Sequence, residues 1–99
     1  MHRVIVSFGD RITEDIYHGR DSTSSRRISR SLWQRIQSKL DLLNAAISLQ
    51  DLRVPPSNHL EKLRGNLIGF HSVRVNSQYR LVFRFEECNC SEVRCMDYH

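Results

Sequence analysis

From Ile28 onward, the spacing of apolar residues changes at Pro55-Pro56, and this change limits the possible folds more than any other feature. Between Ile28 and the prolines, apolar residues recur every three or four positions, which is the period of one helix face. After them, apolar and polar residues alternate, as in half-buried strands. A helical part followed by a sheet part predicts an α+β fold, with helices packed on a small antiparallel sheet. The helical repeat consists of Ile28, Leu32, Ile36, Leu40, Leu43 and Ile47.

The first part of the chain is expected to contain one long amphipathic helix, from about Ser25 to Ala46. This segment holds neither Gly nor Pro, so nothing in it interrupts a helix. A short first strand is expected at Val4 to Phe8, and Asp10 can cap a short helix behind it. Ser48 to Asp51 predicts one further capped helical turn. The wet side of the long helix then carries mainly basic residues, namely Arg26, Arg27, Arg30, Arg35 and Lys39.

After the prolines, two strands joined by a polar turn are expected. The first contains Val73 and Val75, and the second contains the alternating residues Leu81, Phe83 and Phe85. A three-residue turn at Asn76-Ser77-Gln78 keeps the apolar residues of both strands on one face and places Arg74 opposite Arg80. Further strands at Leu60 to Arg64 and Val93 to Met96 would complete the sheet.

The arginine pair across this hairpin suggests an anionic partner. Like charges directly opposite on two strands cost roughly a few tenths of a kcal/mol. Arg84 belongs to the same face as Arg74 and Arg80, and Lys62 and Arg64 precede the hairpin. The planar guanidinium fork of arginine suits phosphate oxygens. A solvated sheet face is the alternative explanation.

Length and charge limit the class of protein. The 99 residues predict a single domain spanning 1–99. The net charge is +4, and it is unevenly spread, because residues 25–54 and 55–84 each carry +4 while both ends are acidic. A basic middle favours a polyanion such as nucleic acid. No uncharged stretch is long enough to cross a bilayer, and the N-terminus lacks the features of a secretory signal, so a cytoplasmic location is expected.

The C-terminal residues Asp97-Tyr98-His99 offer acid–base chemistry. Histidine titrates near neutral pH, and tyrosine supplies a hydroxyl and a ring that stacks on a base. If Val93 to Met96 pairs in the sheet, His99 lies near the basic face. RNA cleavage without a metal needs groups that deprotonate a 2′-hydroxyl, stabilise the phosphate and protonate the leaving oxygen. Arginines, a tyrosine and a histidine can supply these roles.

The cysteines offer a competing interpretation. Cys88-x-Cys90 with Cys95 and His99 is a zinc-like mixture of ligands, which would make the protein a zinc-stapled adaptor. The spacing lacks the paired Cys-x-x-Cys knuckles of structural zinc sites, so no metal site is predicted. Three crowded cysteines are also unlike a disulfide framework, which fits a reducing compartment.

Four ordered blocks of the sequence resemble one family, the HigB toxins. These toxins are the host-inhibition or plasmid-maintenance killer branch of the RelE/ParE superfamily. The resemblance implies a RelE-like fold and a ribosome-dependent mRNA endonuclease that uses no cofactor. It also implies a HigA-like helix-turn-helix antitoxin, through which the toxin would reach DNA only indirectly, and translating ribosomes as the target. The blocks are Asp51 to Gly65, Gly69 to Asn76, Tyr79 to Phe85 and Asp97 to His99.

The resemblance also implies a set of site residues. Its implied catalytic residues are Arg64, Arg80, Asp97, Tyr98 and His99, and the RNA-binding residues expected beside them are Lys62, Arg74 and Arg84. Glu61 departs from the family pattern, because some members carry a histidine there. Gyrase inhibitors share the RelE/ParE scaffold, so a non-catalytic inhibitor of a protein target is the alternative function.

Overall fold

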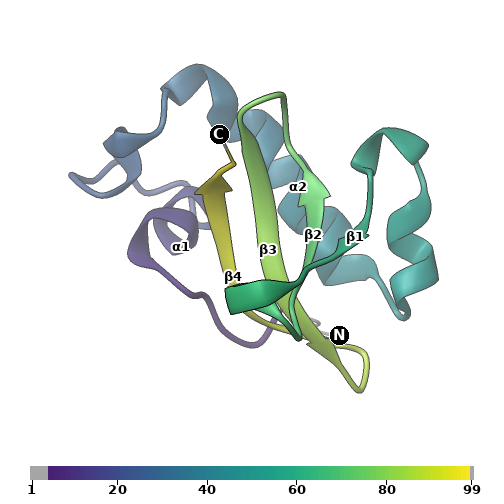
Figure 1. Ribbon diagram of the computed structural model, residues 1–99. Coiled ribbons are helices and arrows are strands. Elements are labelled where there is room, and N and C mark those ends of the chain that lie inside the picture. The colour runs from purple at the N-terminus through teal and green to yellow at the C-terminus, as the bar shows by residue number, and fades with distance from the viewer. Residues whose placement is uncertain (1–4, 99) are drawn as a thin grey trace.

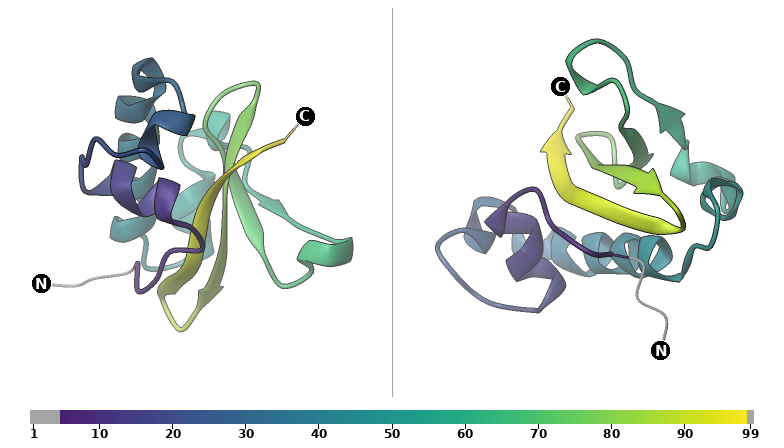
Figure 2. Two further views of the ribbon diagram at one scale, coloured as in Figure 1. Left: turned by 90° about the vertical axis from the view of Figure 1, so that its left-hand side faces the viewer. Right: turned by 90° about the horizontal axis from the view of Figure 1, so that it is seen from below.

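The structure is a computed structural model that describes residues 5–98. Its helices cover one face of a four-stranded antiparallel sheet of order β1-β2-β3-β4 (Figure 1; Figure 2), which confirms the α+β prediction. Within residues 5–98, no helix has the length and apolar character needed to cross a membrane. The two α-helices are α1 (Arg11–Tyr17) and α2 (Trp33–Ala45), and the strands are β1 (Glu61–Lys62), β2 (His71–Arg74), β3 (Tyr79–Glu86) and β4 (Asn89–Asp97). Short 3-10 turns link them: η1 (Ser25–Arg27), η2 (Arg30–Leu32), η3 (Leu49–Arg53), η4 (Pro56–Asn58) and η5 (Gly65–Leu67).

Helix α1 begins where the sequence predicts. The Asp10 carboxylate accepts a hydrogen bond from the Thr13 amide at 2.8 Å, which satisfies a free N–H group of the first turn. The Thr13 hydroxyl in turn accepts from the amide of Cys95 in β4 at 2.8 Å. The cap therefore also ties α1 to the edge of the sheet.

The prediction of one helix from Ser25 to Ala46 is wrong at its start, because α2 begins at Trp33. Ile28 has extended backbone angles, φ −112° and ψ 135°, and its carbonyl accepts a hydrogen bond from the Trp33 indole at 3.0 Å. Upstream, the Ser22 hydroxyl donates to the buried Asp15 carboxylate at 2.6 Å. At the expected helix start, the Ser25 hydroxyl donates to the carbonyl of Arg20 at 2.7 Å, and serine hydroxyls that bond locally compete with helix formation. The apolar period thus continues through a segment that is not helical.

The predicted strand at Val4 to Phe8 is also reduced. Val4 lies outside the described residues, and residues 5–8 make only isolated parallel bridges to β4, Ile5 to Cys90 and Phe8 to Val93. Between these bridges Glu92 has a left-handed backbone, φ 52°. Its amide bonds to the Ser7 hydroxyl at 2.9 Å rather than to a backbone carbonyl. This irregularity in β4 interrupts the ladder.

The predicted hairpin is confirmed. Arg74 pairs with Arg80, and Val73 pairs with Leu81. The Val75 amide donates to the Tyr79 carbonyl at 2.9 Å and closes the three-residue turn. The flanking strands also form, although β1 is shorter than the expected Leu60 to Arg64 and β4 is longer than the expected segment.

The sheet has an apolar cluster on each face. The main cluster fills the space between the helices and the sheet, with Ile16, Ile36, Leu40, Leu81 and Phe83 fully buried. A smaller cluster lies on the outward face, where Leu63, Phe70 and Val82 pack with Leu67 and Met96 beneath η5. The outward face is therefore divided into a covered half, around Phe70, Val82 and Arg84, and an open half, around Arg74, Arg80 and Tyr98.

Candidate active site

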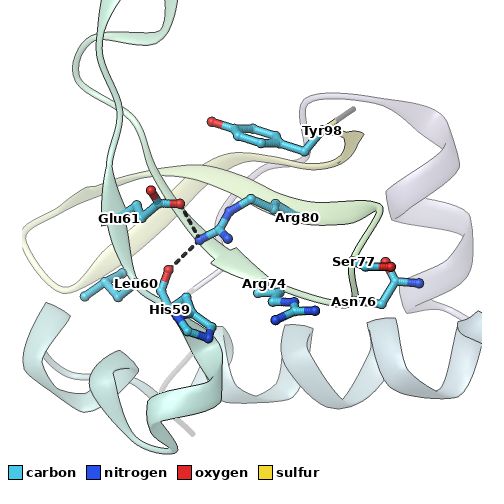
Figure 3. Close-up of a pocket in the computed structure, with 8 residues that line it drawn as sticks. All are labelled: His59, Leu60, Glu61, Arg74, Asn76, Ser77, Arg80 and Tyr98. Carbon is cyan, nitrogen blue, oxygen red and sulfur yellow. Dashed lines mark hydrogen bonds and ion pairs between the residues drawn. The ribbon is translucent and has the colours of Figure 1, made fainter.

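A cleft of about 530 Å³ occupies the open half of the outward face (Figure 3). Its walls come from segments far apart in sequence: the residues after η4, strand β1, the turn between β2 and β3, and the end of β4. The fold brings these segments together because β1 and β4 lie on opposite sides of the central hairpin. The lining residues are His59, Leu60, Glu61, Arg74, Asn76, Ser77, Arg80 and Tyr98.

Arg80 is the buried member of the cleft, with 8% of its surface exposed. Its Nε donates to the Ser72 hydroxyl at 2.8 Å. Its Nη2 lies 3.1 Å from Oε1 of Glu61 and donates to the His59 carbonyl. The Tyr98 ring lies 5.6 Å from Cζ of Arg80, on the cleft side (Figure 3). These contacts hold the guanidinium in one orientation and offset the cost of removing it from water.

Strand register explains how the Arg80 contacts arise. Glu61 and Ser72 are partners across β1 and β2, and cross-strand partners project from the same face of a sheet. Asn58 fixes the chain before β1, since its buried amide donates to the carbonyls of Leu52 at 3.1 Å and Val54 at 3.2 Å. His59 follows in the left-handed conformation, φ 43°. The bonds of Asn58 and the left-handed backbone of His59 thus fix the position of the His59 carbonyl, which Arg80 binds.

Arg74 adds a second, exposed guanidinium opposite Arg80. Beside it, Oδ1 of Asn76 accepts from the amides of Gln78 at 2.9 Å and Tyr79 at 2.7 Å, which fixes the turn. Two guanidinium groups and one carboxylate, that of Glu61, leave the lining with excess positive charge. Such an arrangement can bind a phosphate and stabilise negative charge that develops on it.

The structure brings together three of the eight residues expected at the site, Arg74, Arg80 and Tyr98. Asp97 is not in the lining, and its Oδ2 accepts from the Gln78 side chain at 3.1 Å. Lys62 and Arg64 are exposed outside the lining, with Lys62 paired to His71 in the register of β1 and β2. The predicted His99 lies outside the described residues.

Arg84 lies on the same face as Arg80 but in the covered half. Its Cζ is 4.2 Å from the centre of the Phe70 ring, and its Nε is 2.9 Å from Oε2 of Glu92. Arg94 approaches the same ring at 5.9 Å. Arg84 therefore packs over the small apolar cluster and takes no part in lining the cleft.

Sequence reasoning did not assign Glu61 or His59 to the site. Glu61 enters the sequence analysis only as a departure from the family pattern. The signal for Glu61 was its position within the predicted strand at Leu60 to Arg64, but the register of that strand was needed to place it beside Arg80. His59 accepts a hydrogen bond from Arg80 through its backbone carbonyl. A sequence pattern does not reveal backbone contacts of this kind.

The cysteines lie away from the cleft. Cys90 is buried, and its thiol donates to the carbonyl of Leu43 in α2 at 3.9 Å. Burial raises the pKa of Cys90 to about 12, and burial likewise raises the pKa of Cys95 to about 12. Both thiols are therefore protonated at neutral pH, whereas metals bind the thiolate. Within residues 5–98, no three His, Cys, Asp or Glu side chains are grouped to hold a metal ion.

Comparisons with known proteins identify the family. The chain is 42% identical over 80 residues to Toxin HigB-1 of Vibrio cholerae serotype O1, covering 81% of the chain and 82% of that toxin. The fold resembles that of a YoeB-YefM complex from Staphylococcus aureus, with a TM-score of 0.61, 19% identity, and coverage of 100% of the chain and 99% of that chain. The S. aureus YoeB dimer gives a TM-score of 0.58 at 21% identity, with the same coverage. Residues 6–99 match the family described as RelE-like toxin of type II toxin-antitoxin system HigB, and the chain therefore belongs to this family.

Proposed function

We propose that this toxin is a ribosome-dependent mRNA endonuclease that needs no metal and uses the open half of the sheet as its active site. The observation that carries the proposal is the fixed guanidinium of Arg80, which faces a basic cleft beside Arg74 and Tyr98. Membership of the HigB family supports the same activity, because toxins of this class generally cleave RNA. The cleft supports the phosphate binding that cleavage requires.

Arg80 stabilises the phosphate during cleavage. Attack by a 2′-hydroxyl makes the phosphorus pentacoordinate and places extra negative charge on its oxygens. A donor that is already oriented interacts with this charge without reorganising, and the loss of one such donor typically costs about 10²–10³ in rate. Arg80 is oriented by Ser72, Glu61 and the His59 carbonyl. Arg74, on the other strand of the β-hairpin, binds the same RNA.

The C-terminal tail supplies the base platform and the proton transfer. In this scheme the Tyr98 ring stacks on a base next to the cleaved bond. His99, the following residue, accepts the proton of the attacking 2′-hydroxyl, and water protonates the departing 5′-oxygen. Asp97 fixes the tail through its bond with the Gln78 side chain. Arg64 and Lys62 bind phosphates further along the RNA. Arg84 contributes by holding the covered half of the sheet rather than by touching RNA.

The proposed partners follow from the family. The neighbours of known structure include a YoeB toxin with the YefM protein, and we infer that an antitoxin likewise neutralises this toxin. A HigA-like helix-turn-helix protein fits the HigB branch, and contact with DNA would then pass through it. The target, mRNA on translating ribosomes, places the activity in the cytoplasm.

Mapping of 5′ ends tests the proposal. One message is translated in a bacterial extract with and without the toxin, and a parallel sample is blocked at initiation. We expect new ends only on the translated message. Intact message together with arrested growth of cells expressing the toxin would contradict the nuclease and favour an inhibitor of a protein target such as gyrase. Cleavage in the blocked sample would contradict ribosome dependence.

A further inference from the structure

The active-site cleft does not end at Arg74. Arg74 and Asn76 also line a second hollow of about 370 Å³, whose other walls include Arg35 and Lys39 of α2. A third hollow of about 460 Å³ continues along α2 and again includes Arg35 and Lys39. Shared residues thus connect the cleft around Arg80 with one side of α2.

Within residues 5–98, the basic residues of this connection have no carboxylate as an ion-pair partner. Upstream of α2, Asp21 pairs with Arg26 at 2.8 Å and with Arg30 at 3.5 Å. Among residues 5–98, no carboxylate lies within 4.0 Å of the charged nitrogens of Arg35 or Lys39. The two basic residues are one helical turn apart, roughly 6 Å along the axis. Their positive charges repel each other, as do those of Arg74 and Arg80 across the hairpin.

Lys39 is held in a fixed position. Its Nζ donates to Oδ1 of Asn58, the buried residue whose amide group secures the chain before His59. Burial lowers the pKa of Lys39, and the charge of Arg35 lowers it further. A nearby anion would offset this repulsion. The bond to Asn58 also connects the basic side of α2 to the segment that orients Arg80.

We propose that Arg35 and Lys39, together with Arg74, form a track for single-stranded RNA that leads away from the cleaved phosphate. The proposal rests on the proposed function, because it assigns a role to RNA on one side of the same active site. Phosphates of the flanking nucleotides lie along α2 in this arrangement. The track binds RNA without reading its sequence, since backbone contacts carry no base information. The track leads directly from the proposed cleavage site. We therefore assign it to the same single strand of RNA that is cleaved there.

The track is tested by binding of uncleavable RNA. Fluorescence anisotropy would compare 2′-O-methyl oligonucleotides of about 3 and about 9 nucleotides over a range of salt concentrations. Each phosphate contact contributes about −0.7 to the slope of log affinity against log salt for single strands. For Arg35→Gln we expect a slope reduced by about 0.7 and a two- to fivefold loss of affinity for the long oligonucleotide only. Arg27→Gln, which removes the same charge from an exposed site outside the track, is the matched control.

Three results would overturn the track. Arg35→Gln could bind both oligonucleotides as Arg27→Gln does, or it could lose affinity equally for both lengths. With a 2′-O-methyl duplex hairpin as a third probe, it could also lose affinity for the hairpin alone. Arg35 is exposed, so its substitution is expected to leave the fold intact, and melting of each variant checks this. The assay measures binding without cleavage, so failure of the proposed nuclease in the end-mapping experiment remains a separate result.

Discussion

Arg80 and Arg84 project from the same face of β3, four residues apart, into different surroundings. The side chain of Arg80 is 10% exposed and is surrounded by polar partners, whereas that of Arg84 is 37% exposed and lies over the Phe70 ring. The more buried arginine is the one whose cleft is open to a ligand. Burial and residue type therefore do not by themselves show which arginine faces a cleft. Arg80 lines the cleft beside its polar partners, whereas Arg84 is directed at the Phe70 ring and Glu92.

Both arrangements depend on a carboxylate from another strand. Glu61 of β1 meets Arg80 in the open half, and Glu92 of β4 meets Arg84 in the covered half. In the covered half Gly69 has a φ of +92°, and a Cβ there would lie 2.9 Å from Nη1 of Arg84. The backbone is therefore shaped to receive the Arg84 side chain. Arg80 instead lines the cleft.

The largest expected effect comes from removing the guanidinium of the open half. Arg80→Gln should lower the rate of message cleavage by about 10²–10³, because it removes the oriented donor for the phosphate. Cells expressing this variant should grow, and a single-turnover cleavage assay on programmed ribosomes gives the rate. Thermal melting serves as the control, since Ser72 also loses its partner. A folded variant with wild-type cleavage would remove Arg80 from the mechanism.

A smaller effect is expected at Tyr98, where two substitutions separate ring from hydroxyl. Stacking of one base on an aromatic ring contributes about 1–3 kcal/mol, so Tyr98→Ala should weaken cleavage roughly tenfold to a hundredfold. Tyr98→Phe keeps the ring and should cleave nearly as the wild type does. If both variants lose the same activity in the same assay, the hydroxyl rather than the ring carries the function.

In the covered half, substitution should affect stability and spare cleavage. Arg84→Gln loses a cation–π contact and a partly exposed ion pair, together about 1 kcal/mol. For a domain of this size the melting temperature should then fall by about 4–8 °C. The cleavage rate below the transition should remain within about twofold of the wild type, since roughly 0.4 kcal/mol corresponds to that ratio. A loss of activity as large as that of Arg80→Gln would place RNA on both halves.

The smallest expected effect is a dependence of the melting temperature on pH, which comes from His71 on the helix side of β2. Burial lowers the pKa of His71 below its usual 6.5, and the charge of Lys62 lowers it further. The unfolded chain then takes up the proton first as pH falls, so the contribution of His71 to stability is present above about pH 6.5 and is lost on acidification. Melting temperatures between pH 7.5 and 5.5 should fall more for the wild type than for His71→Phe. Parallel curves for the two proteins would contradict this.

Much of the sheet could be predicted from the sequence because its signals are local. The alternation in β2 and β3, together with the three-residue turn, was sufficient to place Arg74 opposite Arg80. The start of α2 was not predictable from periodicity, since Ile28 and Leu32 keep the helical spacing without being in an α-helix. The hydrogen bonds near the expected helix start, such as that from the Ser22 hydroxyl to Asp15 of α1, depend on how the loop after α1 folds back, which periodicity does not report.

The site was predictable only in part, for a similar reason. Arg80 and Tyr98 were identified as candidates, but the division of the outward face into two halves depends on where the chain after β1 folds back. That path places Phe70 beside Arg84 and leaves the cleft beside Arg80 open. A pattern of basic residues on one face could not distinguish these two positions. The catalytic and RNA-binding roles predicted for all eight residues, His99 among them, stay predictions.

We propose that the open half of the sheet, and not the basic surface in general, cleaves RNA. Mapping of 5′ ends on one translated message, exposed to equal amounts of Arg80→Lys and Arg84→Lys, separates the two possibilities. Both variants keep the charge and lose the planar fork. We predict that Arg84→Lys produces the wild-type set of new ends and that Arg80→Lys produces almost none. Equal cleavage by the two folded variants would contradict the claim.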